Sequence, residues 1–210
     1  MDFSIDYVID SLKNERKVFT SEADFQLALA RKIEKLYTSN VKVRLEFCPE
    51  FKPDMHIDIL VIWTSDNGNK KWIPIELKYK TKDLEYQDDG CVYNLKNHSA
   101  NDWGCYDYMK DIERIELIKH SLGDGFKCGF AIFLTNDDLY IKGTKSDCSY
   151  YNFQINEGRC INNLELVWNK KLKNYAGREK SIKLSGSYKF RWEEYSKIDK
   201  TTFKILVSKI

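Results

Sequence analysis

The chain has 210 residues, of which 42% are hydrophobic and 31% charged, and its formal net charge is +2 at pH 7. This composition is typical of a soluble globular protein that can build a core without disulfides or metals, as one large domain or a core with an elaborated edge. A strongly basic chain would indicate a nucleic-acid partner; here any cationic surface has to be local.

Neither a membrane-spanning helix nor a signal peptide is predicted. No run of 18 apolar residues occurs. The first ten residues carry three aspartates and no basic residue. The cytoplasm is therefore the expected compartment, and the six cysteines are expected to be free thiols there. The series Cys91, His98, Cys105 matches no familiar zinc spacing.

Two helices are predicted at the start of the chain. Apolar residues at helical spacing indicate a helix within residues 3–17. A second helix is expected to begin near Ser21, a good N-cap with Asp24 as its capping-box partner, and to run to about Tyr37.

Three strands are predicted next, two of them joined by a tight turn. Alternating apolar residues indicate a strand over residues 41–47. Residues 56–63 form a nearly continuous apolar run, as expected of a strand covered on both faces. Residues 65–69, Ser-Asp-Asn-Gly-Asn, have a hairpin signature, which makes residues 72–79 the return strand.

The second half of the chain combines one helix with further strands. Residues 83–105 are polar and are interpreted as a long loop, and residues 106–122 as a helix that ends at Gly123. Strands are then expected in four segments, residues 128–135, 139–141, 183–192 and 203–210. This order of elements predicts a mixed α/β fold, in which helices flank a central mixed β-sheet.

Each strand of the predicted hairpin carries a carboxylate among apolar residues. Asp58 lies in the first strand, and Glu76 precedes Lys78 by two residues on the second, so Glu76 and Lys78 point to the same face. A three-residue loop ending at Gly68 would place Asp58 opposite Glu76. A two-residue loop would oppose Asp58 to Leu77 instead, and the two carboxylates would face opposite sides of the sheet.

Two carboxylates and a lysine on one face are suited to metal-assisted phosphodiester hydrolysis. Carboxylates such as Asp58 and Glu76 are ligands that Mg²⁺ prefers, and the backbone carbonyl of Leu77 is a further candidate. The ion would activate a water and polarise the phosphodiester, while Lys78 orients or deprotonates that water or neutralises charge in the transition state. An acid-x-Lys triplet is common by chance, so the alternative is a buried ion pair between Lys78 and one of the acids.

A third acid is expected to face the same sheet. Phe25 belongs to the apolar stripe of the helix that begins near Ser21, and Glu22 lies three residues before it on the same face. Glu22 is therefore predicted to point toward the sheet, the alternative being a favourable position at the helix N-terminus. Gln26, one turn later, could contact the same site or the substrate.

These residues resemble the motifs of the PD-(D/E)XK nuclease superfamily, which has the restriction-endonuclease-like fold. The α-β-β-β-α-β order of the predicted elements is similar to the family core. The resemblance is carried by Glu22 on a first helix, Asp58 in an apolar strand, and Glu76-Leu77-Lys78 after a hairpin. Pro53-Asp54 spells the literal motif but precedes the apolar run, so Asp58 is preferred for the strand position.

The resemblance implies a catalytic centre and a domain layout. Asp58, Glu76, the Leu77 carbonyl and Glu22 would bind Mg²⁺, for which Mn²⁺ could substitute, and Lys78 would be the catalytic lysine. The whole chain, residues 1–210, is expected to form one domain. Its core would cover about residues 19–142, and a β-rich C-terminal extension about residues 145–210.

Several residues near this site are candidates for contacts to nucleic acid. Three aromatic side chains, Tyr79, Trp103 and Tyr106, could stack on bases. Phosphate or other substrate contacts are expected from Gln26, Lys80, Lys82 and Arg114. Each has a plainer interpretation as a packing or surface residue, and Arg114 could instead pair with Asp111. The cluster Lys170, Lys171 and Lys173 is interpreted as a solvated face.

The function expected from the sequence is that of a metal-dependent endonuclease acting on DNA, and restriction or another defence system is a role that fits. A homodimer would suit double-strand cleavage. One alternative is a catalytically inactive nucleic-acid-binding or assembly module on the same fold. Another is a metabolic or regulatory α/β protein in which the motif arose by chance.

Overall fold

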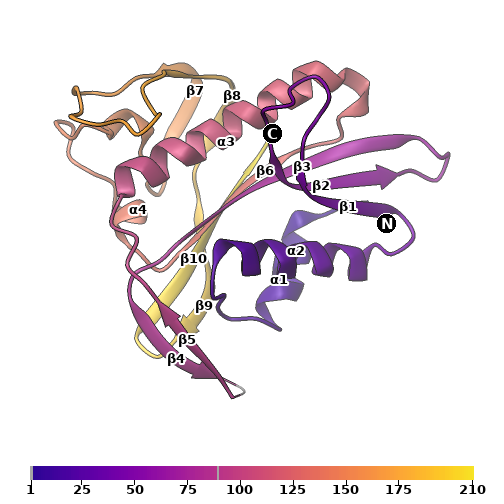
Figure 1. Cartoon of the computed structure of the whole chain (residues 1–210), viewed down its shortest axis with the longest axis horizontal. Coiled ribbons are helices and arrows are strands. Elements are labelled where there is room, and N and C mark those ends of the chain that lie inside the picture. Colours follow the sequence, from indigo (N-terminus) through magenta and orange to yellow (C-terminus); the bar gives the residue numbers. More distant parts are fainter. Residues whose placement is uncertain (1, 89) are drawn as a thin grey trace.

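A six-stranded mixed β-sheet with helices on both faces forms the centre of the molecule (Figure 1). The structure is a computed structural model and describes residues 2–88 and 90–210. In sheet order the strands are β1 (Val41–Phe47), β2 (Ile57–Thr64), β3 (Lys70–Lys80), β6 (Phe130–Thr135), β10 (Thr201–Lys209) and β9 (Trp192–Ile198). Only β3 and β6 are parallel neighbours in this sheet. The predicted mixed α/β class, with helices packed on a central mixed sheet, is confirmed.

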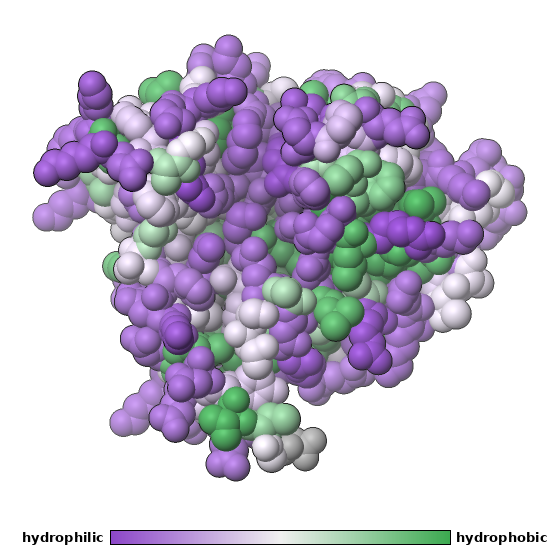
Figure 2. Space-filling view, in the orientation of Figure 1, coloured by the Kyte–Doolittle hydropathy of each residue, from purple (hydrophilic) through white to green (hydrophobic). Residues whose placement is uncertain are grey.

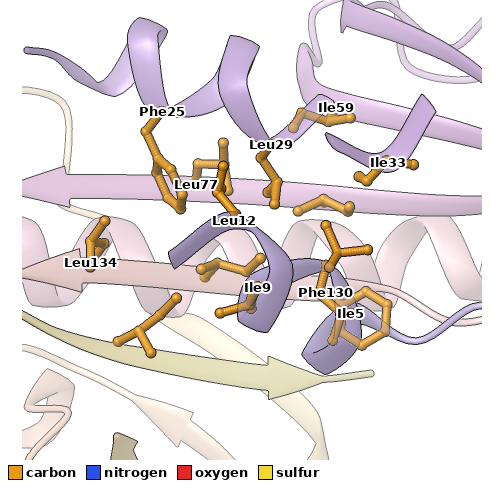
Figure 3. Close-up of a cluster of buried hydrophobic side chains, with 14 of the residues drawn as sticks. Ile5, Ile9, Leu12, Phe25, Leu29, Ile33, Ile59, Leu77, Phe130 and Leu134 are labelled. Carbon is orange, nitrogen blue, oxygen red and sulfur yellow. The ribbon is translucent and has the colours of Figure 1, made fainter. Parts of the chain in front are cut away.

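Helices α1 (Ile5–Lys13) and α2 (Glu22–Leu36) cover one face of the sheet. The predicted N-cap of α2 is confirmed, because Ser21 Oγ accepts a hydrogen bond from the Asp24 amide at 3.1 Å. Figure 3 shows the apolar stripes of the two helices packed against the sheet. The labelled side chains are Ile5, Ile9 and Leu12 of α1, Phe25, Leu29 and Ile33 of α2, and Ile59, Leu77, Phe130 and Leu134 of the sheet.

The β2–β3 hairpin has the three-residue loop, one of the two loop lengths that the sequence left open. The Ser65 amide donates to the Asn69 carbonyl at 2.9 Å, and Gly68 has a φ of +81°, the left-handed region that favours glycine. The pairing of Ile59 with Ile75 fixes the register. Continued by one residue beyond the last paired position, this register places Asp58 opposite Glu76.

Helix α3 (Asn101–Leu122) packs on the other face of the sheet and leads from the end of β3 toward β6. Its residues Tyr108, Ile112 and Ile115 belong to the second core cluster, together with Phe133 of β6 and Leu206 of β10. A helical crossover of this kind is the usual connection between parallel strands such as β3 and β6.

A second hairpin, β7 (Cys160–Leu166) and β8 (Ile182–Lys189), lies beside α3. It is tied to the helix by Glu116, whose carboxylate accepts from the amides of Ser185 and Gly186 and from the hydroxyl of Tyr188. Figure 1 shows this hairpin on the side of α3 away from the α1–α2 pair.

Three of the predicted elements are wrong. The long loop at residues 83–105 is instead a hairpin, β4 (Leu84–Asp88) and β5 (Cys91–Leu95), followed by the first turn of α3. Alternate side chains of this hairpin, including the Tyr86–Tyr93 pair at 6.0 Å between ring centroids, pack against the main core despite its polar sequence. The polar residues at its ends conceal this short alternation.

The second error is the strand expected at residues 139–141. This segment is a short helix, α4 (Leu139–Lys142), and the Asp137 carboxylate accepts from the Leu139 amide at its start. The third error is the strand expected at residues 183–192, which is two strands: β8 ends at Lys189 and β9 begins at Trp192. Apolar runs this short do not distinguish a strand from a helix or reveal a corner between strands.

The C-terminal segment shares its sheet with the rest of the chain. Strand β10 pairs with β6 on one side and with β9 on the other, so the segment from about residue 145 onward supplies two strands of the central sheet as well as the β7–β8 hairpin. Within the part of the chain that the structure describes, no helix is long and apolar enough to span a membrane.

Candidate active site

The candidate site lies where the β2–β3 hairpin opens. Past this point β3 no longer pairs with β2, and two of its backbone amides donate to carboxylates instead. Asp58 Oδ2 accepts from the Leu77 amide at 2.6 Å, and Glu22 Oε2, from the first residue of α2, accepts from the Tyr79 amide at 2.7 Å. The predicted orientation of Glu22 toward the sheet is therefore confirmed.

Glu76 is the most unusual group in this site. Its side chain is fully buried, and neither carboxylate oxygen has a hydrogen-bond partner among the residues described. Arg114 Nη2 lies 3.1 Å from Glu76 Oε1, an ion-pair distance without hydrogen-bond geometry. Burial, followed by the nearby charges of Asp111 and Asp58, raises the pKa of Glu76 well above its ordinary value despite the opposing charge of Arg114.

Lys78 is held as a cation beside Glu76. Its Nζ lies 2.6 Å from Asp111 Oδ2 and donates to the Leu77 carbonyl at 3.0 Å. Burial by itself lowers the pKa of Lys78, but the carboxylates of Asp111, Glu22 and Asp58 outweigh it and raise the pKa above the usual value. In this arrangement Lys78 is suited to neutralising negative charge rather than to accepting a proton.

Asp111 of α3 completes the site, and the sequence analysis considered it only as a partner for Arg114. That pair exists, with Arg114 Nη1 3.4 Å from Asp111 Oδ1, but Asp111 also contacts Lys78. Burial raises the pKa of Asp111 to about 6, although Lys78 and Arg114 oppose the shift. The available signal was a carboxylate at position 111 on the apolar face of a helix that also carries Tyr108 and Ile112.

Arg114 and Gln26 lie at the site in roles more specific than those expected. Arg114 is not on the polar side of its helix: it is three-quarters buried, donates to the His56 carbonyl, and approaches Glu76. Gln26 Nε2 donates to the Asp58 carbonyl and to Glu46, each at 2.7 Å. Both residues hold the backbone around Asp58, and contact with nucleic acid stays a prediction for each.

The other expected substrate contacts lie farther along β3 or in the core. Lys82 Nζ is 3.5 Å from Asp137, and Lys80 is half-buried. Tyr79 and Tyr106 are buried, and their hydroxyls donate to backbone carbonyls at 2.9 Å. The expectation that these two tyrosines stack on bases is therefore wrong.

Trp103, the third aromatic candidate, is half-buried near the start of α3. The Arg178 guanidinium lies 5.0 Å from the centroid of its ring. One face of the indole is therefore already covered by a cation.

A cleft of about 660 Å³ leads from solvent to this site between the β1–β2 connection and α3. Asp58 and Arg114 are the residues of the site that line it. The whole lining consists of Lys52, Asp54, Met55, His56, Asp58, Lys110, Glu113, Arg114 and Leu117. Asp54, from the literal Pro53-Asp54 pair, is exposed near the cleft mouth and pairs with Lys52, which agrees with the choice of Asp58 as the strand carboxylate.

The donor atoms fit a magnesium ion in part. Among residues 2–88 and 90–210 no three His, Cys, Asp or Glu side chains are arranged as a ready metal cluster. Magnesium sites commonly use one or two carboxylates and complete the shell with water and substrate oxygens, so Asp58 and Glu76 meet the minimum. The two unpartnered oxygens of Glu76 are the ones that such an ion would satisfy.

Two further predicted ligands already have partners. Glu22 Oε2 accepts from the Tyr79 amide, and the Leu77 carbonyl accepts from Lys78. Because a carbonyl or carboxylate oxygen has two lone pairs, these contacts leave room for a second one.

Comparison of the chain with family models, with curated protein sequences and with solved structures found no match in any of the three.

Proposed function

We propose that this chain is a magnesium-dependent endonuclease that hydrolyses phosphodiester bonds in DNA, built on a PD-(D/E)XK-type core. The observation that carries the proposal is Glu76, a fully buried carboxylate with two unpartnered oxygens, placed opposite Asp58 and two residues before Lys78. Burying such a group costs free energy unless a bound cation or ligand compensates it. The ion pair with Arg114 compensates this charge in part and leaves both oxygens without a hydrogen bond.

Each residue of the site has a distinct proposed role. Asp58 and Glu76 hold the ion, with the Leu77 carbonyl and Glu22 as additional oxygen donors, and a bound Mg²⁺ would polarise the phosphodiester and acidify a water. Lys78, kept charged by Asp111, neutralises charge that develops on the phosphate. Arg114 balances the negative charge of Glu76 from the cleft side.

A second candidate is a catalytically inactive nucleic-acid-binding module on the same fold. It is favoured by the two cations already present: Lys78 contacts the Leu77 carbonyl, and Arg114 approaches Glu76. In that case the acids and bases would form a closed ion network, which is the structural alternative to a metal site.

Plasmid cleavage in the presence of Mg²⁺ or Mn²⁺ tests the proposal. The wild type is expected to cut, and Asp58→Ala and Lys78→Ala are each expected to lose at least about 100-fold in rate, because each removes a group that stabilises charge in the transition state. Chelation with EDTA should abolish cleavage by the wild type.

Matched controls come from the same hairpin. Lys70→Ala removes an exposed lysine from the opposite end of β3, and Asp66→Ala removes an exposed carboxylate from the turn, so both should cleave at the wild-type rate. Wild-type activity in Asp58→Ala or Lys78→Ala would contradict the site assignment. Metal-independent DNA binding without any cleavage would favour the second candidate.

A further inference from the structure

The loop between β7 and β8 carries a concentrated positive charge. Residues 167–181 contain five basic residues and one acidic residue, a net charge of +4. The whole chain is only +2, so the remainder of the chain is net −2. Positive charge gathered in one loop of an otherwise slightly acidic protein produces a local field that attracts phosphate groups.

The four lysines of this loop, Lys170, Lys171, Lys173 and Lys180, are exposed. Lys170 Nζ lies 3.8 Å from Asp147, and both side chains are more than half exposed, so water and salt screen this pair strongly. Within residues 2–88 and 90–210 the other three lysines form no ion pair. Their charges are therefore available to an external anion. In Figure 2 the surface over the β7–β8 hairpin is mostly hydrophilic.

The loop is anchored to α3 rather than free in solvent. The ring of Trp168 stacks on Tyr106 with 5.6 Å between ring centroids, and its Nε1 donates to the Arg178 carbonyl at 2.7 Å. Arg178 itself makes two 2.7 Å bonds to the Asp107 carboxylate. The lysines are thus presented from a fixed frame, which lowers the entropy lost when a ligand binds.

The anchor also places the loop next to the cleft. On α3, Asp107, Lys110 and Arg114 follow one another at helical spacing, so the residue that holds the loop shares a stripe with two residues that line the cleft. Asp107 and Arg114 are separated by about 10 Å along the helix axis, a distance that about three nucleotides of one B-form strand would span. Glu113, which also lines the cleft, accepts from the Lys183 amide at the start of β8.

We infer that the β7–β8 loop binds backbone phosphates of duplex DNA, a few nucleotides from the phosphodiester that enters the cleft at Asp58. The inference rests on the proposed nuclease function for its choice of DNA as the ligand. It goes beyond that function by assigning Lys170, Lys171, Lys173 and Lys180 to a binding surface outside the catalytic centre. Such contacts would hold the duplex in register without reading its sequence.

Fluorescence anisotropy with a labelled DNA duplex of mixed sequence, without divalent metal and over a range of NaCl concentrations, tests the inference on the full-length chain. The triple variant Lys170→Gln, Lys171→Gln, Lys173→Gln is expected to reduce the slope of log affinity against log salt by about 2 to 3, because each lost phosphate contact removes about one from that slope. The matched control, Lys35→Gln, Lys197→Gln, Lys200→Gln, removes three exposed lysines from α2, β9 and the β9–β10 turn, and its slope should equal that of the wild type.

The outcomes separate this inference from the proposed function, provided that cleavage with Mg²⁺ is measured in parallel. Three results would overturn the inference. The loop variant could keep the salt slope of the wild type, the control variant could lose as much of that slope as the loop variant, or the wild type could fail to bind duplex DNA. Tighter, loop-dependent binding of an RNA duplex would overturn the choice of DNA. Loop-dependent DNA binding by a wild type that never cleaves would support the inference and reject the nuclease. Cleavage by the wild type, together with DNA binding that does not depend on the loop, would support the nuclease and reject the inference.

Discussion

Two buried glutamates show how differently the same side chain is used in this protein. Glu116 accepts three hydrogen bonds, at 2.8 Å from the Ser185 amide, 2.7 Å from the Gly186 amide and 2.6 Å from the Tyr188 hydroxyl. Glu76 is buried as deeply, yet neither of its oxygens accepts a hydrogen bond from the described residues, and its ion-pair partner is Arg114 at 3.1 Å. The first carboxylate stabilises the fold through these bonds, whereas the second lacks them, and this difference is the basis of the proposed metal site.

This contrast leads to opposite expectations for two identical substitutions. Burial, Asp111 and Asp58 raise the pKa of Glu76, so the metal-free protein should lose stability as the pH rises from the ordinary value of this group toward the raised one. Glu76→Gln carries no charge to bury. It should therefore melt at a higher temperature than the wild type without metal, and the difference should be larger at about pH 8 than at about pH 5. The variant should show neither cleavage nor a rise in melting temperature on adding Mg²⁺.

Glu116→Gln is the matched control for that experiment. Its amide nitrogen would face donors, so the free energy of unfolding should fall by about 1 to 3 kcal/mol, while the folded fraction keeps its cleavage activity and its response to Mg²⁺. Thermal melts of both variants, with and without Mg²⁺, provide the measurement. A stabilising shift by Mg²⁺ in Glu76→Gln equal to that of the wild type would show that Glu76 does not hold the ion.

At the scale of the element, the β2–β3 turn determines on which face the carboxylates lie. Gly68 has a φ of +81°, and an added Cβ would meet no atom within 4 Å. The cost of Gly68→Ala therefore comes from the left-handed backbone conformation and not from a steric clash with neighbouring residues. We expect the substitution to lower the free energy of unfolding by about 1 to 2 kcal/mol. The specific activity of folded protein should not change, because Asp58 lies about 20 Å along the strand.

Gly125→Ala is the corresponding control. Its φ lies outside the left-handed region, and an added Cβ would meet only the Cβ of Leu122 at 3.7 Å, an ordinary contact. Urea denaturation of the two variants should therefore show a clear loss only for Gly68→Ala. Equal stability of the two would mean that the hairpin does not require the left-handed residue.

At the scale of the whole molecule, the C-terminal strand β10 is an internal strand of the sheet, between β6 and the edge strand β9. Leu206 of β10 is fully buried in the cluster with Phe133 and Ile112. Leu206→Ala should lower the free energy of unfolding by about 2 to 5 kcal/mol. Tryptophan fluorescence in urea should still report one transition, because both faces of the sheet depend on this strand.

Leu164→Ala makes the same change on the β7–β8 hairpin, where Leu164 is 47% exposed. That variant should stay within about 0.5 kcal/mol of the wild type. If Leu206→Ala instead produced two separate transitions, the C-terminal segment would unfold independently of the core.

Much of the fold was predictable because its signals are local. Helical periodicity indicated α1 and α2, an apolar run indicated β2, and alternation indicated β1, which begins and ends where it was expected. The polar β4–β5 hairpin was missed because alternation in five-residue strands is weak, and α4 was misassigned because three apolar residues carry no period.

Some features of the candidate site were likewise predictable from local sequence, and others were not. Alternation along β3 placed Lys78 on the Glu76 face, whereas Asp58 could lie opposite Glu76 only if the turn had an odd length, which the structure decided. The sequence analysis also predicted that Glu22 faces the sheet. It did not assign Asp111 to the site, since Asp111 and Lys78 are separated by 33 positions and no local pattern relates them.

By itself, therefore, the sequence determined helices α1 and α2, strands β1 and β2, the pairing of β2 with β3 and the face that Glu76 shares with Lys78. All of these follow from backbone geometry over a few neighbouring residues. Only the tertiary structure decided three other features: the insertion of β10 between β6 and β9, the contact of Asp111 with Lys78, and the anchoring of the basic β7–β8 loop to α3. These features depend on which distant apolar surfaces pack together, and no periodicity within one segment encodes that choice.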